Sequence, residues 1–204
     1  MTDDVMTGDI SNLFFICGPH GAGKTTLLEQ MQKLNPKIML PKLVTRTVPL
    51  HTDPYERIKL KLCQRALENY ETIIIAKQHH ENIIIGNRCV YDAIAYADSY
   101  LKKSWISKAQ HTELLTHNTY LFPTQTHEPK AIILNPPVEQ ILSHLQSRWR
   151  TGVKKWNEED VSYASAAHEA YKQFKNNRKI LYFTKADPSE VMDHMIRMMT
   201  KKPY

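Results

Sequence analysis

No run of hydrophobic residues in the 204-residue sequence is long enough to cross a membrane. The longest apolar stretches, such as residues 13–17 and 73–76, have the length of a β-strand, whereas a membrane helix needs about 20 apolar residues. The first residues carry Asp3, Asp4 and Asp9 where a secretion signal would need a positive start and an apolar stretch. We therefore expect a cytoplasmic protein without a membrane segment.

Cysteine is scarce, and histidine shows no metal-binding spacing. The three cysteines are far apart and include no C-x-x-C pair, so neither a disulfide framework nor a zinc site is expected at Cys17, Cys63 and Cys89. The ten histidines contain no H-x-x-x-H or H-E-x-x-H pattern. The sequence predicts buried, reduced thiols and no metal bound by histidine.

The chain also lacks internal repeats and linkers rich in glycine or serine, so we expect a single domain over residues 1–204. Its formal net charge of +6 would suit nucleic acid, a membrane surface or a small polyanionic substrate. The positive residues are dispersed except in residues 148–155, and no nucleic-acid recognition motif accompanies them. We expect a small phosphorylated ligand, and no nucleic-acid or membrane partner.

Short apolar segments that alternate with amphipathic ones indicate an α/β protein. Four segments are apolar throughout, as strands buried on both faces of a parallel sheet are: residues 13–17, 83–86, 131–134 and 180–183. Residues 37–44 predict a further strand, in which Pro41 requires an edge or a bulge. The alternation predicts a doubly wound α/β sandwich.

Helical spacing and capping residues place the connecting segments. Residues 57–80 contain a β-branched stretch but keep helical spacing without a turn residue, so they predict one long helix. Asn135 precedes another helix start, and residues 187–190 form a capping box with proline at the first helical position. Residues 122–129, with two prolines and two threonines, predict a surface connection.

The strongest motif lies directly after the first strand, where residues 18–25 match the P-loop pattern G-x-x-x-x-G-K-[ST] completely. In such a loop, backbone N–H groups and the helix N-terminus bind phosphate oxygens, the lysine reaches the outer phosphates, and the Ser/Thr hydroxyl binds Mg²⁺. Lys24 is therefore a predicted catalytic residue, and Thr25 is the predicted metal ligand. The residues predicted to bind the cofactors ATP and Mg²⁺ are Gly18, Pro19, His20, Gly21, Ala22, Gly23, Lys24, Thr25 and Thr26.

A second motif follows the third strand and resembles the D-R-Y-x-x-S-x-x-A-Y element of thymidylate kinases and the E-R-S element of deoxynucleoside kinases. It comprises residues 84–88 with Tyr91, Asp92, Ala95 and Tyr96. The resemblance implies that Arg88 contacts the phosphate or hydroxyl end of the acceptor and that Tyr96 lies on the helix that walls the acceptor pocket. Arg46, in a Thr-Arg pair after the second strand, matches part of the T-R-E-P-G stretch of thymidylate kinases and is a further candidate for acceptor binding.

One position departs from the resembled families. They carry Asp or Glu where this chain has Asn87, and that carboxylate helps to hold Mg²⁺ or activates the acceptor hydroxyl. A nucleoside benefits from a nearby base, whereas a monophosphate already presents an anionic oxygen, so Asn87 favours a monophosphate. Asp92, a substrate-binding candidate, could substitute through a water, as could Asp53 or Glu56.

A basic cluster near residue 150 resembles the arginine-bearing lid of nucleoside and nucleotide kinases, with the R-x-R spacing of the deoxynucleoside kinases. Arg148 and Arg150 are the predicted catalytic arginines of this lid, which we place at residues 148–158, with Lys154 and Lys155 in reserve. Guanidinium groups over the transferring phosphoryl group would stabilise its charge while the lid excludes water. A new helix, capped at Asn157, is expected to follow.

The resemblance extends from residue 13 to about residue 199 in motifs and in the order of elements. It implies a three-layer P-loop sandwich with a five-stranded parallel sheet in the order 2-3-1-4-5 and a helical lid. It also implies ATP-dependent phosphoryl transfer to a nucleoside monophosphate or a deoxynucleoside, with Mg²⁺, in a protein that could form homodimers.

Two alternatives stay open. The chain could be a nucleotide-binding ATPase or regulatory module with a degenerate kinase site, or it could phosphorylate another small metabolite. A GTPase would be expected to carry N-K-x-D, and a motor-type ATPase an apolar strand that ends in Asp, and neither feature is found. The P-loop alone does not decide between a kinase and a binding module.

Overall fold

The computed structural model describes residues 10–44, 53–123, 126, 128–152, 157 and 159–200. At its centre is a five-stranded sheet in the order β2-β3-β1-β4-β5, with all neighbouring strands parallel. The strands are β1 (Leu13–Cys17), β2 (Ile38–Met39), β3 (Ile83–Asn87), β4 (Ala131–Leu134) and β5 (Ile180–Phe183). The strand order implied by the kinase resemblance is confirmed.

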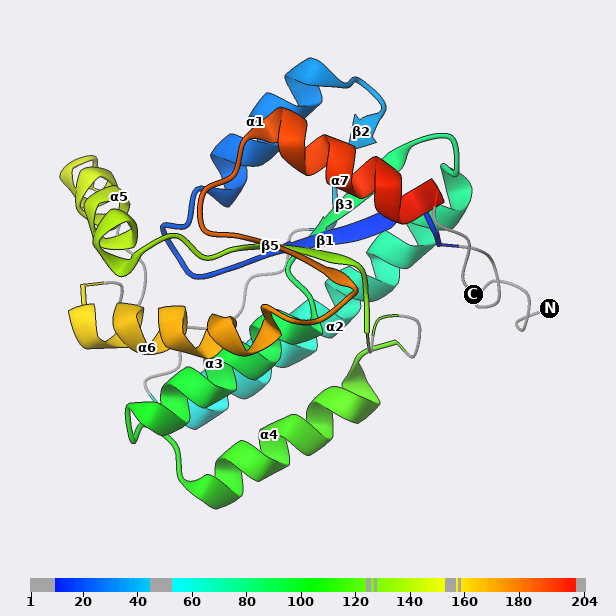
Figure 1. Ribbon diagram of the computed structural model, residues 1–204. Coiled ribbons are helices and arrows are strands. Elements are labelled where there is room, and N and C mark those ends of the chain that lie inside the picture. The colour runs from blue at the N-terminus through cyan, green and yellow to red at the C-terminus, as the bar shows by residue number, and fades with distance from the viewer. Residues whose placement is uncertain are drawn as a thin grey trace.

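Helices lie on both sides of the sheet, which confirms the three-layer α/β sandwich (Figure 1). One side carries α1 and α7, the other α2, α3, α4 and α6, and α5 lies beyond one end of the strands. These helices are α1 (Lys24–Leu34), α2 (Pro54–Gln78), α3 (Val90–Lys102), α4 (Lys108–Leu121), α5 (Val138–Arg150), α6 (Val161–Tyr171) and α7 (Pro188–Thr200).

The central strand β1 is buried on both faces because its side chains alternate between two hydrophobic cores. Phe14 and Ile16 pack in the core under α1 and α7, whereas Leu13, Phe15 and Cys17 pack in the core on the opposite side. All five residues are buried. This double burial explains why the sequence of β1 is apolar without alternation, and it fixes the position of the loop that follows.

The segment with mixed helix and strand character is one helix, as its spacing predicts. The 25-residue α2 begins at Pro54, and the side chain of Asp53 caps it by accepting a hydrogen bond from the N–H of Glu56. Thr72, in the β-branched stretch, donates its hydroxyl to the carbonyl oxygen of Glu68 inside the helix. Among the helices of the described residues, none is long and apolar enough to cross a membrane.

The second strand is much shorter than the sequence predicts. Only Ile38 and Met39 pair with β3, whereas a strand over residues 37–44 is expected. Residues 40–44 are outside the ladder, and a proline at position 41 has no N–H to donate to it. The prediction is therefore corrected to a two-residue edge strand. Arg46 lies outside the described residues, so its predicted role stays a prediction.

The expectation for residues 122–129 is corrected in part. Of the residues that the structure describes in this predicted surface connection, Phe122 is 2% exposed and Thr126 is fully buried, whereas Glu128 is exposed. The apolar side chain of Phe122 joins the core beneath the sheet, and the carbonyl oxygen of Pro129 accepts a hydrogen bond from the hydroxyl of Tyr91. Composition alone suggested a loop, but an aromatic residue at its start draws it inward.

Helix starts near the predicted lid also differ from expectation. The helix after residue 150 is capped by Asp160, whose carboxylate accepts the N–H of Tyr163, and not by Asn157. Asn157 has φ 51°, a left-handed conformation, whereas an N-cap residue is extended. At the start of α5, Pro137 is the cap, and the side chain of Asn135 instead donates to the carbonyl oxygen of His168.

Candidate functional site

The P-loop joins β1 to α1 at the carboxyl edge of the sheet. Gly18, Gly21 and Gly23 all have positive φ, of 136°, 79° and 88°. Gly18 also has no room for a side chain, because a Cβ there would lie 2.1 Å from the carbonyl oxygen of Leu134. At the start of α1 no side chain caps the helix, so its first N–H groups can meet an anion.

The side chain of Lys24 folds back and contacts the backbone of the P-loop. Its Nζ donates to the carbonyl oxygens of Gly18, at 2.8 Å, and of Pro19, at 2.7 Å. Burial, followed by the nearby charge of Arg88, lowers the pKa of Lys24 well below its usual value. A bound phosphate would replace these two carbonyl contacts and favour the charged amine, which is the chemistry that the motif predicts.

A cleft of about 680 Å³ opens over the loop. A volume of this size suits a nucleotide-sized ligand. Of the predicted site residues it is lined by His20 to Thr26, Arg88 and Arg148. The lining residues that were not predicted include polar and charged ones from α2, from one face of α5 and from the segment after β5: Arg65, Gln140, His144, Thr184 and Lys185.

Two signals in the sequence could have identified several of the lining residues that were not predicted. Gln140, His144 and Arg148 are spaced four residues apart, so they share one face of α5. Residues 184–186 directly follow β5, and ligands of open α/β sheets bind beyond the carboxyl ends of the strands. Both signals are present in the sequence, but neither specifies a ligand.

Arg88 faces the base of the P-loop. It has φ 69°, and 7% of its surface is exposed. The Nη1 atom donates to the carbonyl oxygen of Gly18 at 3.2 Å, to Oδ1 of Asp92 at 2.6 Å and to the hydroxyl of Tyr96 at 3.1 Å. The predicted contact with an acceptor stays a prediction, and what the structure describes is a guanidinium that ties β3 to the first residue of the loop.

Asp92 lies behind the loop and is 2% exposed. Besides Arg88, its carboxylate accepts the hydroxyl of Tyr171 at 2.5 Å and the backbone N–H of Gly18 at 3.4 Å. Burial alone would raise the pKa of Asp92, but the charges of Arg88 and Lys24 outweigh it and lower the pKa. Asp92 is an ionised residue whose partners are all internal, and it is not among the described residues that line the cleft.

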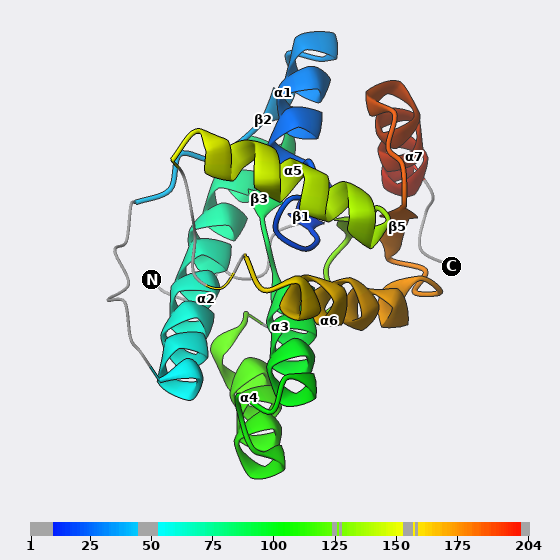
Figure 2. The same ribbon diagram turned by 90° about the vertical axis from the view of Figure 1, so that its left-hand side faces the viewer.

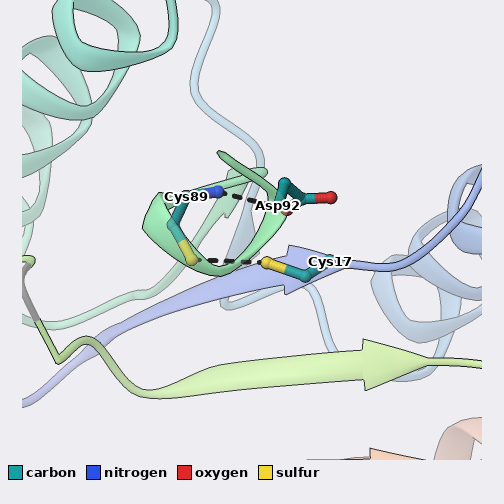
Figure 3. A group of neighbouring side chains, drawn as sticks. All are labelled: Cys17, Cys89 and Asp92. Atoms are coloured by element: carbon teal, nitrogen blue, oxygen red, sulfur yellow. Dashed lines mark hydrogen bonds between the residues drawn. The ribbon is translucent and has the colours of Figure 1, made fainter. Parts of the chain in front are cut away.

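Two cysteines lie next to this carboxylate (Figure 3). Sγ of Cys17, the last residue of β1, is 3.3 Å from Sγ of Cys89, and the N–H of Cys89 donates to Asp92. The three side chains are close enough to share a metal ion. Burial raises the pKa of the Cys17 thiol well above its usual range, and Asp92 is paired with Arg88. In the structure the cluster joins the end of β1 to the start of α3.

Aromatic rings fill the space between α3 and α6 beside the loop. The ring of Tyr96 lies beneath Arg88, with 5.2 Å between the guanidinium carbon and the ring centroid, and is 5.6 Å from the ring of His20. Tyr163 and Tyr171 of α6 contact Tyr96 at 6.5 Å and 6.2 Å between centroids. Tyr96 is thus next to the loop but is not among the described residues that line the cleft, so its predicted place at an acceptor pocket stays a prediction. No motif in the sequence singles out Tyr163 or Tyr171.

The structure separates the two predicted lid arginines. Arg148 lines the cleft, whereas Arg150, two residues later in the last turn of α5, is exposed and is not among the lining residues. Residues 153–156 and 158, which include Lys154 and Lys155, lie outside the described part of the chain. The roles proposed for these residues stay predictions.

The chain matches the family described as "AAA domain" over residues 13–184. No curated protein matches its sequence. Among solved structures, it is similar to deoxyadenosine kinase from M. mycoides with bound dCTP, with 14% identity, a TM-score of 0.60 and coverage of 91% of this chain and 98% of that one. The same enzyme with bound dATP has 15% identity, a TM-score of 0.55 and coverage of 92% and 99%. The structure of that enzyme with its products dCMP and a flexible dCDP has 14% identity, a TM-score of 0.59 and coverage of 91% of this chain and 96% of that one.

Proposed function

The chain belongs to the AAA domain family that its sequence matches, and we propose that it is a P-loop kinase that transfers a phosphoryl group from ATP to a nucleotide-type acceptor. The observation that carries the proposal is the complete P-loop beneath an open cleft on which several cationic side chains converge. These are Lys24 from the loop, Arg65 from α2, Arg88 after β3 and Arg148 from α5. Cations from four elements suit the charge of a transferring phosphoryl group.

The donor would occupy the part of the cleft next to the loop and α5. Its phosphates would meet the loop N–H groups and Lys24, while the segment at residues 184–186 offers space for the base. Mg²⁺ would neutralise charge on the phosphate oxygens. Thr25, exposed in the first turn of α1 and lining the cleft, is the residue that would hold it.

The residues around the cleft favour a monophosphate acceptor. Among the described residues that line the cleft there is no Asp or Glu, and Asn87 stands at the end of β3. A nucleoside hydroxyl must lose a proton during transfer and benefits from a carboxylate base, whereas a monophosphate oxygen is already anionic. The solved structures of similar fold are those of a deoxyadenosine kinase, which by its name phosphorylates a nucleoside and whose product is dCMP, so they support the deoxynucleoside alternative and identify no base for this chain.

A second candidate, a nucleotide-binding module without acceptor, is favoured by one observation. Arg88, the residue expected to contact the acceptor, makes its hydrogen bonds to the protein itself. In that case the cleft would bind ATP, and no acceptor would speed its consumption.

The deciding experiment measures ADP formation from Mg·ATP by the full-length protein. Nucleoside monophosphates and deoxynucleosides are added singly, and a sample without acceptor serves as the control. Stimulation by a monophosphate supports the proposal, and stimulation by a deoxynucleoside alone would require a base that the described cleft lacks. Tight ATP binding with no stimulated turnover would instead establish the binding module.

A further inference from the structure

Helix α5 contacts the tip of the P-loop through His144. Nδ1 of His144 lies 2.8 Å from the carbonyl oxygen of Gly21, which is 123 residues away in the chain. Helix and loop are packed closely here, because a Cβ on Gly21 would lie 2.9 Å from the carbonyl oxygen of Ile141 and 2.9 Å from Cγ of Leu145. Figure 2 shows the turn after β1 next to α5.

This contact fixes a proton on the histidine and the direction of a peptide unit in the loop. A carbonyl oxygen only accepts hydrogen bonds, so Nδ1 of His144 must carry the proton. In a trans peptide the C=O and N–H point in opposite directions. Because the carbonyl of Gly21 points toward α5, the N–H of Ala22, in the same peptide unit, points away from α5.

The N–H of Ala22 faces the interior of the loop. It lies 3.3 Å from the carbonyl oxygen of Pro19, the same oxygen that Nζ of Lys24 contacts at 2.7 Å. The amide and the lysine therefore converge on one acceptor atom. A phosphate oxygen that replaced this carbonyl would receive both donors.

We propose that His144 is a positioning residue for the bound nucleotide, an inference that rests on the proposed binding of ATP. By holding the carbonyl of Gly21 toward α5, it keeps the N–H of Ala22 aimed at the phosphate. His144 lies one turn before Arg148 on the same face of α5, and both line the cleft. The helix that presents a predicted catalytic arginine thus also orients the loop.

Substitutions of His144 separate this role from a general effect on the helix. In His144→Asn, the amide Nδ2 is as many bonds from Cβ as Nδ1 of histidine, so it can donate to the same carbonyl. In His144→Gln, the donor is one bond further out, and in His144→Ala it is absent. Glutamine favours helices more than asparagine does, so an effect through helix stability would rank the two variants in the opposite order.

The readout is the affinity for Mg·ATP, measured by calorimetry on the full-length protein. We expect His144→Ala and His144→Gln to bind about three- to tenfold more weakly, the value of one lost hydrogen bond, and His144→Asn to stay within about twofold of the unsubstituted protein. Gln146→Ala, at an exposed position on α5 that does not line the cleft, is the matched control and should not change the affinity. Equal affinities for all variants, or glutamine binding better than asparagine, would overturn the proposal.

A measurement on the free protein keeps the inference separate from the proposed function. The ring ¹⁵N and ¹³C shifts of His144 report which nitrogen carries the proton, and hydrogen exchange reports how firmly the Ala22 amide is held. We expect the Nδ1–H tautomer, and faster exchange at Ala22 in His144→Ala than in His144→Asn. A proton on Nε2 alone would refute the positioning role even if ATP binds, whereas the expected signals in a protein that binds no ATP would refute only the function.

Discussion

The buried ion pair between Arg88 and Asp92 gives the most direct test of how the site is held together. The change is Asp92→Asn, which keeps the size of the side chain and removes its charge. The two side chains are 8% and 3% exposed and 2.6 Å apart, so solvent screens the pair very little. Loss of one partner leaves a buried guanidinium unpaired, which costs about 3–5 kcal/mol of unfolding free energy.

The size of this effect can be followed by thermal and urea unfolding at pH 7. For a domain of this length, about 3–5 kcal/mol corresponds to a melting temperature lower by roughly 6–20 °C. Asp98→Asn is the control, since Asp98 pairs with His111 but its side chain is 31% exposed, and its loss should stay within about 1 kcal/mol. If the two variants lose equal stability, the argument from burial is wrong.

The same variant predicts a dependence on pH. The pKa of Asp92 is lowered in the folded protein, so its contribution is fully present above the unfolded value of about 3.9 and is lost as the pH falls through the lower folded value. The gap in stability between the unsubstituted protein and Asp92→Asn should therefore stay constant from neutral pH to about pH 4 and then shrink. A gap that shrinks already near pH 6 would point to another group.

Two further predictions concern the P-loop. Lys24→Ala should abolish ATP turnover and weaken ATP binding while leaving the circular dichroism spectrum unchanged, and unaltered turnover would exclude the loop as the phosphate site. Gly18→Ala should lower both the melting temperature and ATP affinity, because its Cβ would lie 2.1 Å from the carbonyl oxygen of Leu134. Gly23→Ala is a useful comparison, since a Cβ there meets nothing within 4 Å and only the positive φ of 88° opposes it.

Much of the architecture was predictable because strands buried on both faces have a simple signature. The apolar composition of residues in β1, β3, β4 and β5 was enough to predict these four strands, and the kinase resemblance implied the order of the strands in the sheet. Local signals failed where tertiary packing decides. Phe122 is buried although it begins a segment of polar composition. Asn157 has a left-handed backbone, and Asp160 caps the helix in its place.

The candidate site was predictable only in part, for a related reason. The P-loop is contiguous in sequence, so its spacing alone identified Lys24 and Thr25. Contacts between segments that are distant in the sequence have no characteristic spacing. The hydrogen bonds from His144 to Gly21 and from Tyr171 to Asp92 could therefore not be inferred from the sequence. Asp92 was a predicted site residue, but its burial behind the loop involves Tyr171 of α6, which lies far along the chain.

The different environments of the three cysteines have a practical consequence for spectroscopy. Cys17 and Cys89 are buried, while Cys63 is exposed on α2. Thiol reagents need an accessible thiolate, so a maleimide dye should attach to Cys63 first in the folded protein. That residue is two positions from Arg65, which lines the cleft. Residues two apart on a helix point to different sides, so Cys63 is not on the cleft-lining face of α2. The natural sequence thus offers a single attachment point for a fluorescent reporter on the helix that borders the proposed nucleotide site, without any engineered cysteine.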